Sequence, residues 1–503
     1  MLEKNILELI RETSTNLPAD IVEALIQARN LESKTLSSQK RGSRGNLSLE
    51  VILKNIELAQ NQKTPICQDT GLLTFFVKAE PSTWKKIGKA IRSAVRKATK
   101  EGILRPNAVD SISGKNVGNI PKIEFDFLTS SKKGNVEIAL LLKGGGSENV
   151  SAQIALPTQT DFGFAKRDSE GVKLVALQIL KNAGGKGCPP GIISIVIGGD
   201  RASGFALAKK NLLKKIGEEN PNPKLKKLEA EILCAANKLK IGAGGFGGRA
   251  TLLDCKVDCL HRHPASFFVS AAYSCWACRR GKVILDSRGK IIKPRLKTPL
   301  TSQLTGRLTS ENLKLGKIKK IKLPISAAEV RKLKAGEVVS VSGKIFTARD
   351  RVHELVVRGG LTPEISRGLK GAGVFHCGPI AIQIEVPRQA RGKFSKKIWR
   401  FIAAGPTTSA RLEPFTPKFI EKTGVRILIG KGGMGEATAR ALRKFGCVYL
   451  HAIGGAAAFY ANSVHEVCGV DFLEEFGMPE AMWSIEVKNF LAIVGIDSSG
   501  GKL

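Results

Sequence analysis

The sequence of 503 residues is poor in several features that mark particular classes of protein. Aromatic residues make up only 6%, with three Tyr and four Trp, so the chain lacks the composition of a platform that stacks single-stranded bases. Ten Cys are too few for a disulfide-stapled scaffold. Apolar runs such as Ile192–Ile197 are too short to span a bilayer, and the N-terminus has no signal-peptide pattern. We therefore expect a cytoplasmic protein with no membrane partner.

Acidic residues are also scarce beside basic ones. The chain has 44 Asp and Glu against 80 Lys and Arg, which gives a formal net charge of +36. Such an excess can serve nucleic acid, an anionic membrane surface or anionic metabolites. The positive charge is spread over the whole chain, and no zinc-finger, basic-zipper or RNA-recognition signature accompanies it. A solvated basic surface is the simplest interpretation, and we do not expect a nucleic-acid partner.

The length predicts about two to four domains. The stretch from Ile284 to Pro324 is rich in Lys, Thr and Ser and poor in apolar clusters, which is typical of a linker. We therefore predict an N-terminal domain at 1–285, a linker at 286–320 and a C-terminal domain at 321–503.

Hydrophobic periodicity predicts both helices and strands, and therefore an α/β fold. Helices are predicted over most of 1–60 and at 84–101, 169–183, 349–358 and 436–446. Strands are predicted at 123–128, 136–142, 192–197, 380–386 and 425–429, with the first two joined by a polar turn. Residues 337–341 and 344–346 are predicted to form a short hairpin.

Three cysteines lie in loops bounded by Pro, Gly or Ser. Their contexts are Thr64-Pro-Ile-Cys67-Gln-Asp69-Thr70-Gly71, Gly187-Cys188-Pro-Pro-Gly191 and Ser274-Cys275-Trp-Ala-Cys278-Arg-Arg280. Prolines stiffen a loop, which suits the presentation of a thiolate to a metal. Each motif alone is weak, because a buried structural thiol explains one Cys equally well. The C-x-x-C spacing at 275–278 suggests redox or zinc chemistry, and Cys255-x3-Cys259-x-His261-x-His263 superficially spells a zinc site.

Together these motifs resemble the class I, iron–sulfur-dependent fumarate hydratases and the related tartrate dehydratases, over almost the whole chain. The family's C-Q-D-T-G motif, its Cys before Pro and Gly, and its C-x-A-x-R-R/H motif are found at 67–71, 188–191 and 275–280. The third motif selects Cys275 rather than Cys278. The resemblance implies a [4Fe-4S] cluster held by Cys67, Cys188 and Cys275. Three thiolates leave one iron open to act as a Lewis acid.

Further positions in the first half match the family's motifs. The matching segments are Gln68-Asp69, Leu104-Arg105-Pro-Asn107, Gly144-Gly-Gly146-Ser147 and His261-Arg-His263-Pro. The resemblance implies catalytic roles for Asp69 and His263. It implies substrate binding by Gln68, Arg105 and Gly146.

The second half resembles the family's β-type unit. Its motifs are Ala348-Arg349-Asp350 followed by His353, Gly405-Pro-Thr407-Thr408-Ser-Ala-Arg411, and Gly430-Lys431-Gly. The resemblance implies that Thr407 is the base and that Arg349, Arg411 and Lys431 bind the substrate. Cations suit a dicarboxylate, and Arg can hold a carboxylate through two parallel hydrogen bonds.

The resemblance implies an N-terminal mixed α/β iron–sulfur hydro-lyase domain, a C-terminal swivelling β/α domain and a homodimer. The implied activity is the reversible hydration of fumarate to (S)-malate. Tartrate dehydration to oxaloacetate is an alternative in the same class. A basic nucleic-acid-binding protein or a non-catalytic cluster protein is an alternative in another class, although intact Asp69, Thr407, Arg411 and Lys431 favour an active enzyme.

Overall fold

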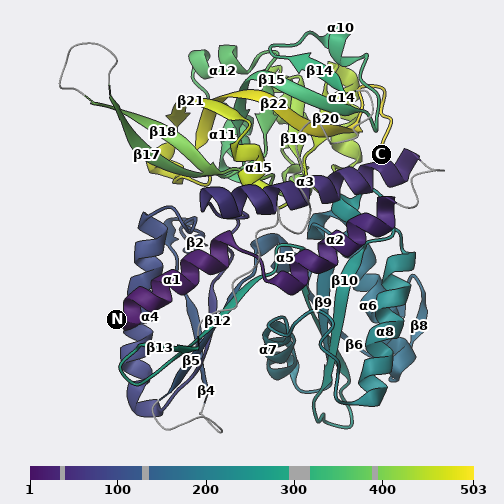
Figure 1. Cartoon of the computed structure of the whole chain (residues 1–503). Coiled ribbons are helices and arrows are strands. Elements are labelled where there is room, and N and C mark those ends of the chain that lie inside the picture. Colours follow the sequence, from purple (N-terminus) through teal and green to yellow (C-terminus); the bar gives the residue numbers. More distant parts are fainter. Residues whose placement is uncertain (34–39, 127–134, 294–317, 388–394) are drawn as a thin grey trace. The chain divides into compact units, whose positions relative to one another are not determined.

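A computed structural model describes residues 1–33, 40–126, 135–293, 318–387 and 395–503 (Figure 1). The chain forms two compact units. Unit 1 comprises Met1–Leu53, Asp69–Ala98 and Ile120–Leu308, and unit 2 comprises Lys54–Gln68, Thr99–Asn119 and Thr309–Leu503. The expected α/β class with separate N- and C-terminal domains is confirmed. Two short stretches of the first half nevertheless pack with the second half, which the sequence did not predict.

The described part of unit 1 contains a five-stranded sheet, a four-stranded sheet, the two-stranded pair β7-β8 and several helices. Its helices are α1 (Leu2–Thr15), α2 (Ala19–Ser33), most of α3 (Lys40–Gln62) and α4 (Trp84–Lys100), α5 (Gly145–Asn149), α6 (Ser169–Ala183), α7 (Arg201–Asn211) and α8 (Pro223–Lys238). Its strands are β1 (Thr74–Lys78), β4 (Lys122–Asp126), β5 (Val136–Leu142), β6 (Ala152–Ala155), β7 (Thr158–Thr160), β8 (Gly163–Ala165), β9 (Gly191–Ile197), β10 (Leu252–Cys259), β11 (Phe268–Ser274), β12 (Arg279–Leu285) and β13 (Ile291–Lys293).

The first sheet of unit 1 has the strand order β13-β12-β5-β1-β4. β1 pairs with β4 in parallel and with β5 in an antiparallel register. The two strands predicted near 123–128 and 136–142 are therefore not neighbours in the sheet, because β1 lies between them. β1 is an interior strand between β5 and β4, and four of its five residues are buried.

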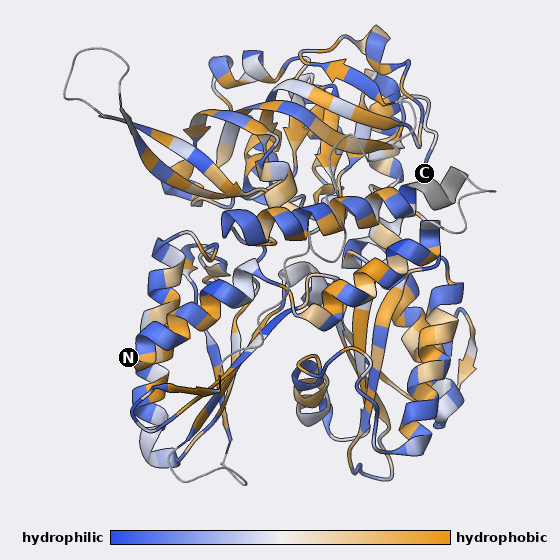
Figure 2. Cartoon of the chain, viewed as in Figure 1, coloured by the Kyte–Doolittle hydropathy of each residue, from blue (hydrophilic) through white to orange (hydrophobic). Residues whose placement is uncertain are grey.

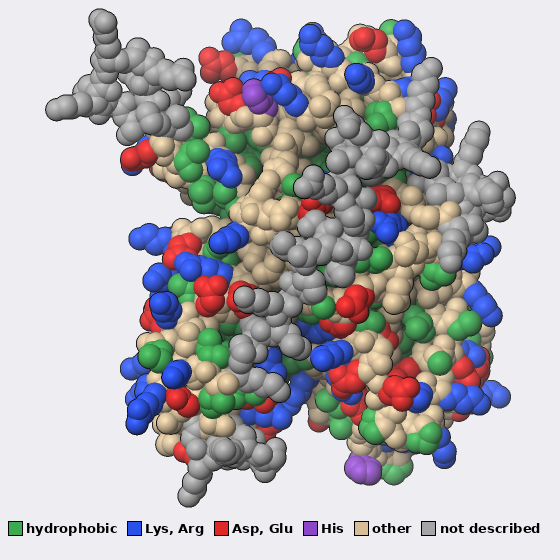
Figure 3. Space-filling model, in the orientation of Figure 1, with side chains coloured by type: hydrophobic (Ala, Val, Ile, Leu, Met, Phe, Trp, Pro, Cys, Tyr) green, Lys and Arg blue, Asp and Glu red, His purple; other side chains and the backbone are tan. Residues whose placement is uncertain are grey.

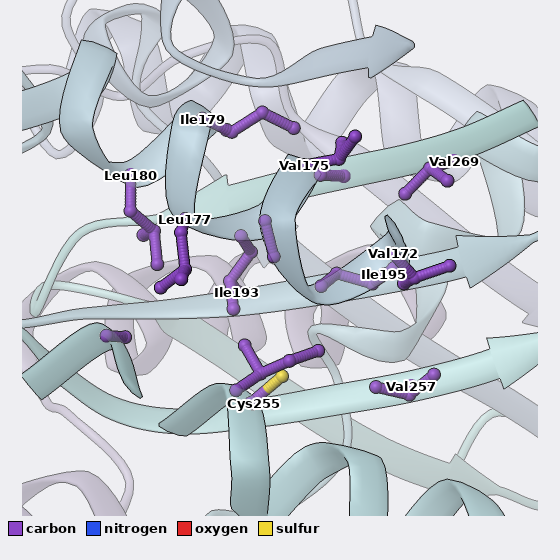
Figure 4. Packing of buried hydrophobic residues seen from close by; sticks show 14 of the residues in the cluster. Val172, Val175, Leu177, Ile179, Leu180, Ile193, Ile195, Cys255, Val257 and Val269 are labelled. Atoms are coloured by element: carbon purple, nitrogen blue, oxygen red, sulfur yellow. The ribbon is translucent and has the colours of Figure 1, made fainter. Parts of the chain in front are cut away.

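The second sheet of unit 1 has the order β10-β9-β11-β6. Helix α6 begins after Asp168, whose side chain accepts a hydrogen bond from the Gly171 N–H and so caps the helix. Its apolar face packs on the sheet, where Figure 4 shows Val172, Val175, Leu177, Ile179 and Leu180 facing residues of β9, β10 and β11. Hydrophobic colour follows these strands in Figure 2. This core holds β9 and β11 in the register that positions two of the predicted ligands.

Unit 2 is built on a seven-stranded sheet of order β14-β15-β16-β19-β20-β22-β21. Its strands are β2 (Ala108–Val109), β3 (Asn116–Gly118), β14 (Lys319–Lys322), β15 (Val338–Thr347), β16 (Gly373–Phe375), β17 (Ile380–Pro387), β18 (Ser395–Ala403), β19 (Ile427–Gly430), β20 (Val448–His451), β21 (Val464–Asp471) and β22 (Met482–Ile496). Its helices are α10 (Ala327–Val330), α11 (Asp350–Arg358), α12 (Pro363–Leu369), α13 (Thr416–Thr423), α14 (Glu436–Phe445), α15 (Ala457–Ala461) and α16 (Leu473–Phe476), with a short 3-10 turn, η4 (Ser409–Leu412).

One sequence prediction for unit 2 is wrong. The predicted hairpin at 337–346 is the single strand β15, which is irregular between Val341 and Gly343. Gly343 has φ +118°, and a Cβ there would lie 2.7 Å from the Leu323 carbonyl oxygen. This glycine therefore allows the segment at Leu323 to approach β15 closely, and it does not mark a turn. The predicted linker at 286–320 includes β13 and the start of β14, and its residues 294–317 lie outside the described ranges.

The parallel strands of unit 2 create an edge suited to a ligand. β15, β16, β19 and β20 run parallel to their neighbours in this order. In open α/β sheets, ligands bind beyond the carboxyl ends of such strands. Here those ends lead to Arg349, His376 and Lys431, and β20 ends at His451.

Basic side chains are widely distributed. Figure 3 shows Lys and Arg spread over the visible face, with Asp and Glu between them. Within the described ranges, no helix has the length and apolar character needed to cross a membrane.

Candidate active site

Cys188 lies in a tight loop between α6 and β9 in unit 1. It adopts a left-handed conformation, with φ +52°, and its side chain is buried. The Tyr273 ring packs against both sides of this loop. A Cβ added at Gly187 or Gly191 would lie 2.8 Å or 2.2 Å from that ring, so glycine is required at both positions. The loop is thus held by close contact with β11.

Cys275 directly follows β11, at the same end of the sheet as Cys188. The antiparallel register pairs Ser274 with Ile192, close to the start of β9. The Cys275 N–H donates a hydrogen bond to Ser147 Oγ at 3.2 Å. Burial raises the pKa of Tyr273 well above its usual range, and both Cys275 and Cys188 add to the rise. The structure therefore brings these two predicted ligands together.

A buried ammonium group lies behind this pair. Lys143 Nζ bonds to Glu148 Oε2 at 2.8 Å and to Ser151 Oγ at 3.1 Å, and Lys209 Nζ contacts Glu148 Oε1 at 2.5 Å. Burial lowers the pKa of Lys143, while Glu148 and Cys275 oppose that shift. Sequence reasoning missed Lys143, although a lone Lys at the end of the apolar strand β5 was a signal.

Asp69 and the Gly144–Ser147 segment, both predicted from motifs, lie together in unit 1. The Gly71 N–H donates to Asp69 Oδ1 at 3.2 Å, and the main-chain oxygen of Asp69 accepts from Arg279 Nη2 at 2.5 Å. A Cβ on Gly144 would lie 2.9 Å from Asp69 Oδ2. Glycine at 144 therefore lets the carboxylate approach the turn that begins α5, which contains Gly146.

His263 is not brought to this end of the sheet. It lies in the exposed loop between β10 and β11, where its Nδ1 accepts from the Ala265 N–H at 3.1 Å. The loop adjoins the far end of β9, because the Leu260 N–H donates to the Ile197 oxygen. β9 has seven residues, or about 20 Å of strand, between this loop and Cys188. The catalytic role of His263 stays a prediction.

Thr407 and Lys431 lie side by side in unit 2. The Lys431 N–H donates to the Thr407 oxygen at 3.3 Å, and the Ser409 N–H donates to the Lys431 oxygen at 2.9 Å. Thr408 and Lys431 form an isolated parallel bridge. The Thr407 N–H donates to the His376 oxygen at 2.7 Å. The two motif loops are therefore joined at the carboxyl edge of the sheet.

Arg349 and Arg411 share one carboxylate. Arg411 Nη2 lies 2.8 Å from Asp350 Oδ2, and Arg349 Nη2 lies 4.0 Å from the same oxygen. Arg349 also contacts Glu480 Oε1 at 2.9 Å, and its buried Nε has no hydrogen-bond partner among the described residues. Burial favours a higher pKa for Asp350, but the two guanidinium groups outweigh it and hold the pKa below its ordinary value.

The segments from the first half carry Gln68, Arg105 and Cys67 into unit 2. Gln68 Nε2 donates to the Gly405 oxygen at 2.7 Å, and Arg105 Nη1 donates to the Gly378 oxygen at 2.6 Å. Both predicted substrate-binding side chains thus also hold main chain at the edge of the sheet. Cys67 is buried, and its Sγ lies 3.7 Å from Gln68 Oε1.

The predicted cluster ligands fall in different units. Within the described ranges, no three His, Cys, Asp or Glu side chains are arranged to hold a metal ion. None of the ten cysteines, all of which lie in the described ranges, forms a disulfide. Two of them, Cys188 and Cys275, lie at the same end of the sheet, and the Lys143 ammonium acts on Cys275, so this cationic setting fits a thiolate-bound cluster. The inclusion of Cys67 stays a prediction.

The remaining cysteines sit in other surroundings. Cys278 is fully buried, with its Sγ 3.9 Å from the Leu212 oxygen. Cys255 lies inside the hydrophobic core of Figure 4, where burial raises its pKa well above the ordinary value. The glycines of 242–248 pack closely on the Cys188 loop: the Gly244 N–H donates to the Pro189 oxygen, and a Cβ on Gly245 would lie 2.6 Å from Gly185.

Comparison with known proteins covers the whole chain. The family described as fumarate hydratase (Fumerase) matches residues 3–284, and the fumarase C-terminus matches residues 291–503. A putative class I fumarate hydratase of Geobacillus stearothermophilus is 41% identical over 100% of this chain and 95% of its own. Putative L(+)-tartrate dehydratase subunits of Methanocaldococcus jannaschii are also similar. The alpha subunit is 37% identical over 56% of this chain and 98% of its own, and the beta subunit is 38% identical over 36% and 87%.

Proposed function

The chain belongs to the fumarate hydratase family of hydro-lyases, and we propose that it reversibly hydrates fumarate to (S)-malate. The observation that carries this proposal is the junction of Thr407 and Lys431 at the carboxyl edge of the unit 2 sheet, in the unit that also holds the Arg349–Asp350–Arg411 cluster. A dicarboxylate substrate needs cations for its two carboxylates and a base near its central carbons. Unit 2 contains residues of both kinds.

In this proposal Arg349 and Arg411 bind substrate carboxylate through paired N–H groups. Asp350 holds the Arg411 guanidinium in place before substrate arrives. Thr407 takes the proton from the carbon next to the hydroxyl-bearing carbon of malate, while the hydroxyl group leaves as water or hydroxide. In the hydration direction Thr407 returns that proton. A Thr hydroxyl is a weak base unaided, and the adjacent Lys431 ammonium favours its ionised form.

We propose that Cys67, Cys188 and Cys275 hold a [4Fe-4S] cluster. Such a cluster supplies Lewis-acid chemistry at the substrate's hydroxyl and carboxylate, through the iron that lacks a protein ligand. Class I fumarate hydratases are known to depend on iron and sulfur. The Lys143 ammonium adds a positive charge near Cys275. Ser147 Oγ accepts a hydrogen bond from the Cys275 N–H and so orients this residue.

Asp69, Gln68, Arg105 and Gly146 keep their predicted roles within this proposal. Asp69 relays a proton, and Gln68 and Arg105 border the bound substrate while holding the main chain beside it. Gly146 donates its main-chain N–H to the substrate. We propose that the enzyme works in the cytoplasm, where cysteines stay out of disulfides, as they do in this structure. We also propose a homodimer, which light scattering of the purified holoenzyme would test.

One anaerobic experiment tests the proposed activity. The reconstituted protein is assayed with fumarate, malate and L(+)-tartrate at equal concentrations, with iron and sulfide determined on the same sample. We expect the largest kcat/KM with fumarate and malate, and loss of turnover on exposure to air. A cluster-loaded protein that turns over neither fumarate nor malate would overturn the proposal.

Tartrate dehydration is the second candidate, because both tartrate dehydratase subunits match this chain at 37% and 38% identity. The two reactions differ by a hydroxyl on the substrate carbon, which a pocket distinguishes by hydrogen bonding. In the same assay, a kcat/KM for L(+)-tartrate above that for malate would establish this candidate instead.

A further inference from the structure

Three fully buried polar side chains lie directly beneath the Thr407–Lys431 junction. They are His376, Ser409 and Tyr449, and each is 0% exposed. Burying a polar group costs free energy unless it is hydrogen-bonded. A group of three at the carboxyl edge of the sheet is therefore a costly feature, and its contacts indicate what it does.

The three side chains form a hydrogen-bonded chain centred on Ser409. The Tyr449 hydroxyl donates to Ser409 Oγ at 3.1 Å, and Ser409 Oγ lies 2.8 Å from His376 Nδ1. Ser409 has a single hydroxyl proton, and with Tyr449 as donor that proton is available to His376 Nδ1. When His376 is neutral and carries its proton on Nε2, its Nδ1 and both hydroxyl groups are satisfied, whereas the buried Nε2 has no hydrogen-bond partner among the described residues. Burial supports this state, because it lowers the pKa of His376 well below the usual value.

The same residues hold the two motif loops through their main chains. The His376 oxygen accepts from the Thr407 N–H at 2.7 Å, and the Ser409 N–H donates to the Lys431 oxygen at 2.9 Å. The Gly433 N–H donates a hydrogen bond to the hydroxyl oxygen of Tyr449. Each of the three residues is thus hydrogen-bonded to a segment that carries Thr407 or Lys431.

The glycine before Lys431 makes room for this chain. A Cβ on Gly430 would lie 1.8 Å from Ser409 Oγ and 3.0 Å from His376 Nδ1. The hydroxyl of Ser409 occupies the space that any other side chain at 430 would need. The glycine is therefore required by the Ser409–His376 hydrogen bond.

We propose that His376, Ser409 and Tyr449 are positioning residues that set the distance and orientation between Thr407 and Lys431. The proposal rests on the proposed function, because it takes Thr407 and Lys431 as the groups that act on the substrate. The network contacts the main chain of both loops, so its loss shifts the two side chains relative to one another. Misplacement of a reacting group by about 1 Å can cost about 100-fold in rate.

The test compares Tyr449→Phe with Tyr460→Phe. Both tyrosines are 0% exposed and belong to unit 2, and the Tyr460 oxygen also accepts a main-chain N–H, from Ile453 at 2.8 Å. The Tyr460 hydroxyl bonds to Ile453 rather than to Ser409, so Tyr460 is a matched control for the loss of a buried hydroxyl. We expect Tyr449→Phe to lower kcat by about 10-fold or more and Tyr460→Phe to leave kcat within about twofold at a similar loss of Tm. Equal effects of the two substitutions on kcat would overturn the proposal.

A double-mutant cycle and an exchange measurement complete the test. If Ser409→Ala and Tyr449→Phe disrupt one network, the double variant loses hardly more kcat than the worse single variant. Additive losses contradict the proposal. Hydrogen exchange of peptides covering 405–411 and 427–433 should accelerate in Tyr449→Phe and not in Tyr460→Phe. This readout needs no substrate, so it distinguishes failure of the positioning role from failure of the proposed activity.

Discussion

The side-chain amide of Gln68 and the main chain of Gly405 form a reciprocal pair of hydrogen bonds. Gln68 Nε2 donates to the Gly405 oxygen at 2.7 Å, and the Gly405 N–H donates to Gln68 Oε1 at 3.1 Å. A Cβ on Gly405 would lie 2.4 Å from Oε1, so the contact requires glycine. The pair joins the residue after Cys67 to the loop that carries Thr407. It gives Gln68 a structural task in addition to its predicted contact with substrate.

Gln68→Glu tests this pair. A carboxylate can accept from the Gly405 N–H but cannot donate to the Gly405 oxygen, so a buried acceptor faces another acceptor. We expect a loss of unfolding free energy of about 1–3 kcal/mol together with a large fall in kcat. Gln62→Glu is the control, because the Gln62 amide also makes a hydrogen bond within unit 2, to Asn462 Oδ1 at 3.1 Å, but is exposed. A Gln68→Glu protein with a raised KM and unchanged stability would show that substrate contact is the side chain's main role.

Thr407→Ala should abolish turnover while leaving the visible absorbance of the reconstituted cluster unchanged. The substitution removes the proposed base and leaves the Thr407 main-chain hydrogen bonds to His376 and Lys431 in place. Thr407→Ser keeps a hydroxyl and should retain measurable turnover. Thr408→Ala is the neighbouring control, since both threonines are half-buried. Turnover by Thr407→Ala close to that of the unchanged protein would exclude Thr407 as the base.

The fold was predictable where local pattern and packing agree. The helix predicted at 169–183 is α6, because its apolar face and its Asp168 cap specify the same boundaries. The hairpin predicted at 337–346 failed because a Ser-Gly pair resembles a turn. The structure shows instead that Gly343 is required because the Leu323 main chain lies too close for a Cβ at this position.

The residues of the candidate site could be proposed from sequence motifs, but the contacts between them could not. Motifs identified Cys188, Cys275, Thr407 and Lys431 as site residues. They could not reveal the Gln68–Gly405 pair, whose members are 337 residues apart. A sequence also does not show that the Tyr273 ring needs glycine on either side of Cys188, since that constraint exists only once β11 lies beside β9.

Buried histidines should make the protein sensitive to mild acid. Burial lowers the pKa of His353 to about 4 and that of His451 to about 3, and it lowers that of His376 well below its ordinary value. Below the ordinary histidine pKa of 6.5 the unfolded chain binds protons that the folded chain does not, so stability falls as pH drops from 6.5 to about 4. Each histidine contributes about 1.4 kcal/mol per pH unit in this window. Urea unfolding at several pH values would measure the slope.

A single substitution tests how much His353 contributes to the dependence of the unfolding free energy on pH. His353 stacks on Phe419 with ring centroids 4.2 Å apart, so His353→Phe keeps an aromatic ring and removes one titrating group. We expect its stability to fall less steeply between pH 6.5 and 5 than that of the unchanged protein. His465→Phe, at an exposed position in β21, is the control. An unchanged slope in His353→Phe would mean that His353 does not stay neutral in the folded protein.

Cys275 and Cys278 provide the sharpest test of the proposed ligand set, because they are three residues apart and only one has been assigned to the cluster. Cys275 is half-buried, lies at the Cys188 end of the sheet and has its N–H held by Ser147, whereas Cys278 is fully buried. Cys275→Ala should lower the iron and sulfide bound after reconstitution. Cys278→Ala should bind both normally and lose only stability, through the small cavity it leaves. Normal iron binding by Cys275→Ala with loss in Cys278→Ala would reverse the assignment. Ser147→Ala leaves both thiols in place but removes the acceptor for the Cys275 N–H, so it should weaken cluster retention less than Cys275→Ala does.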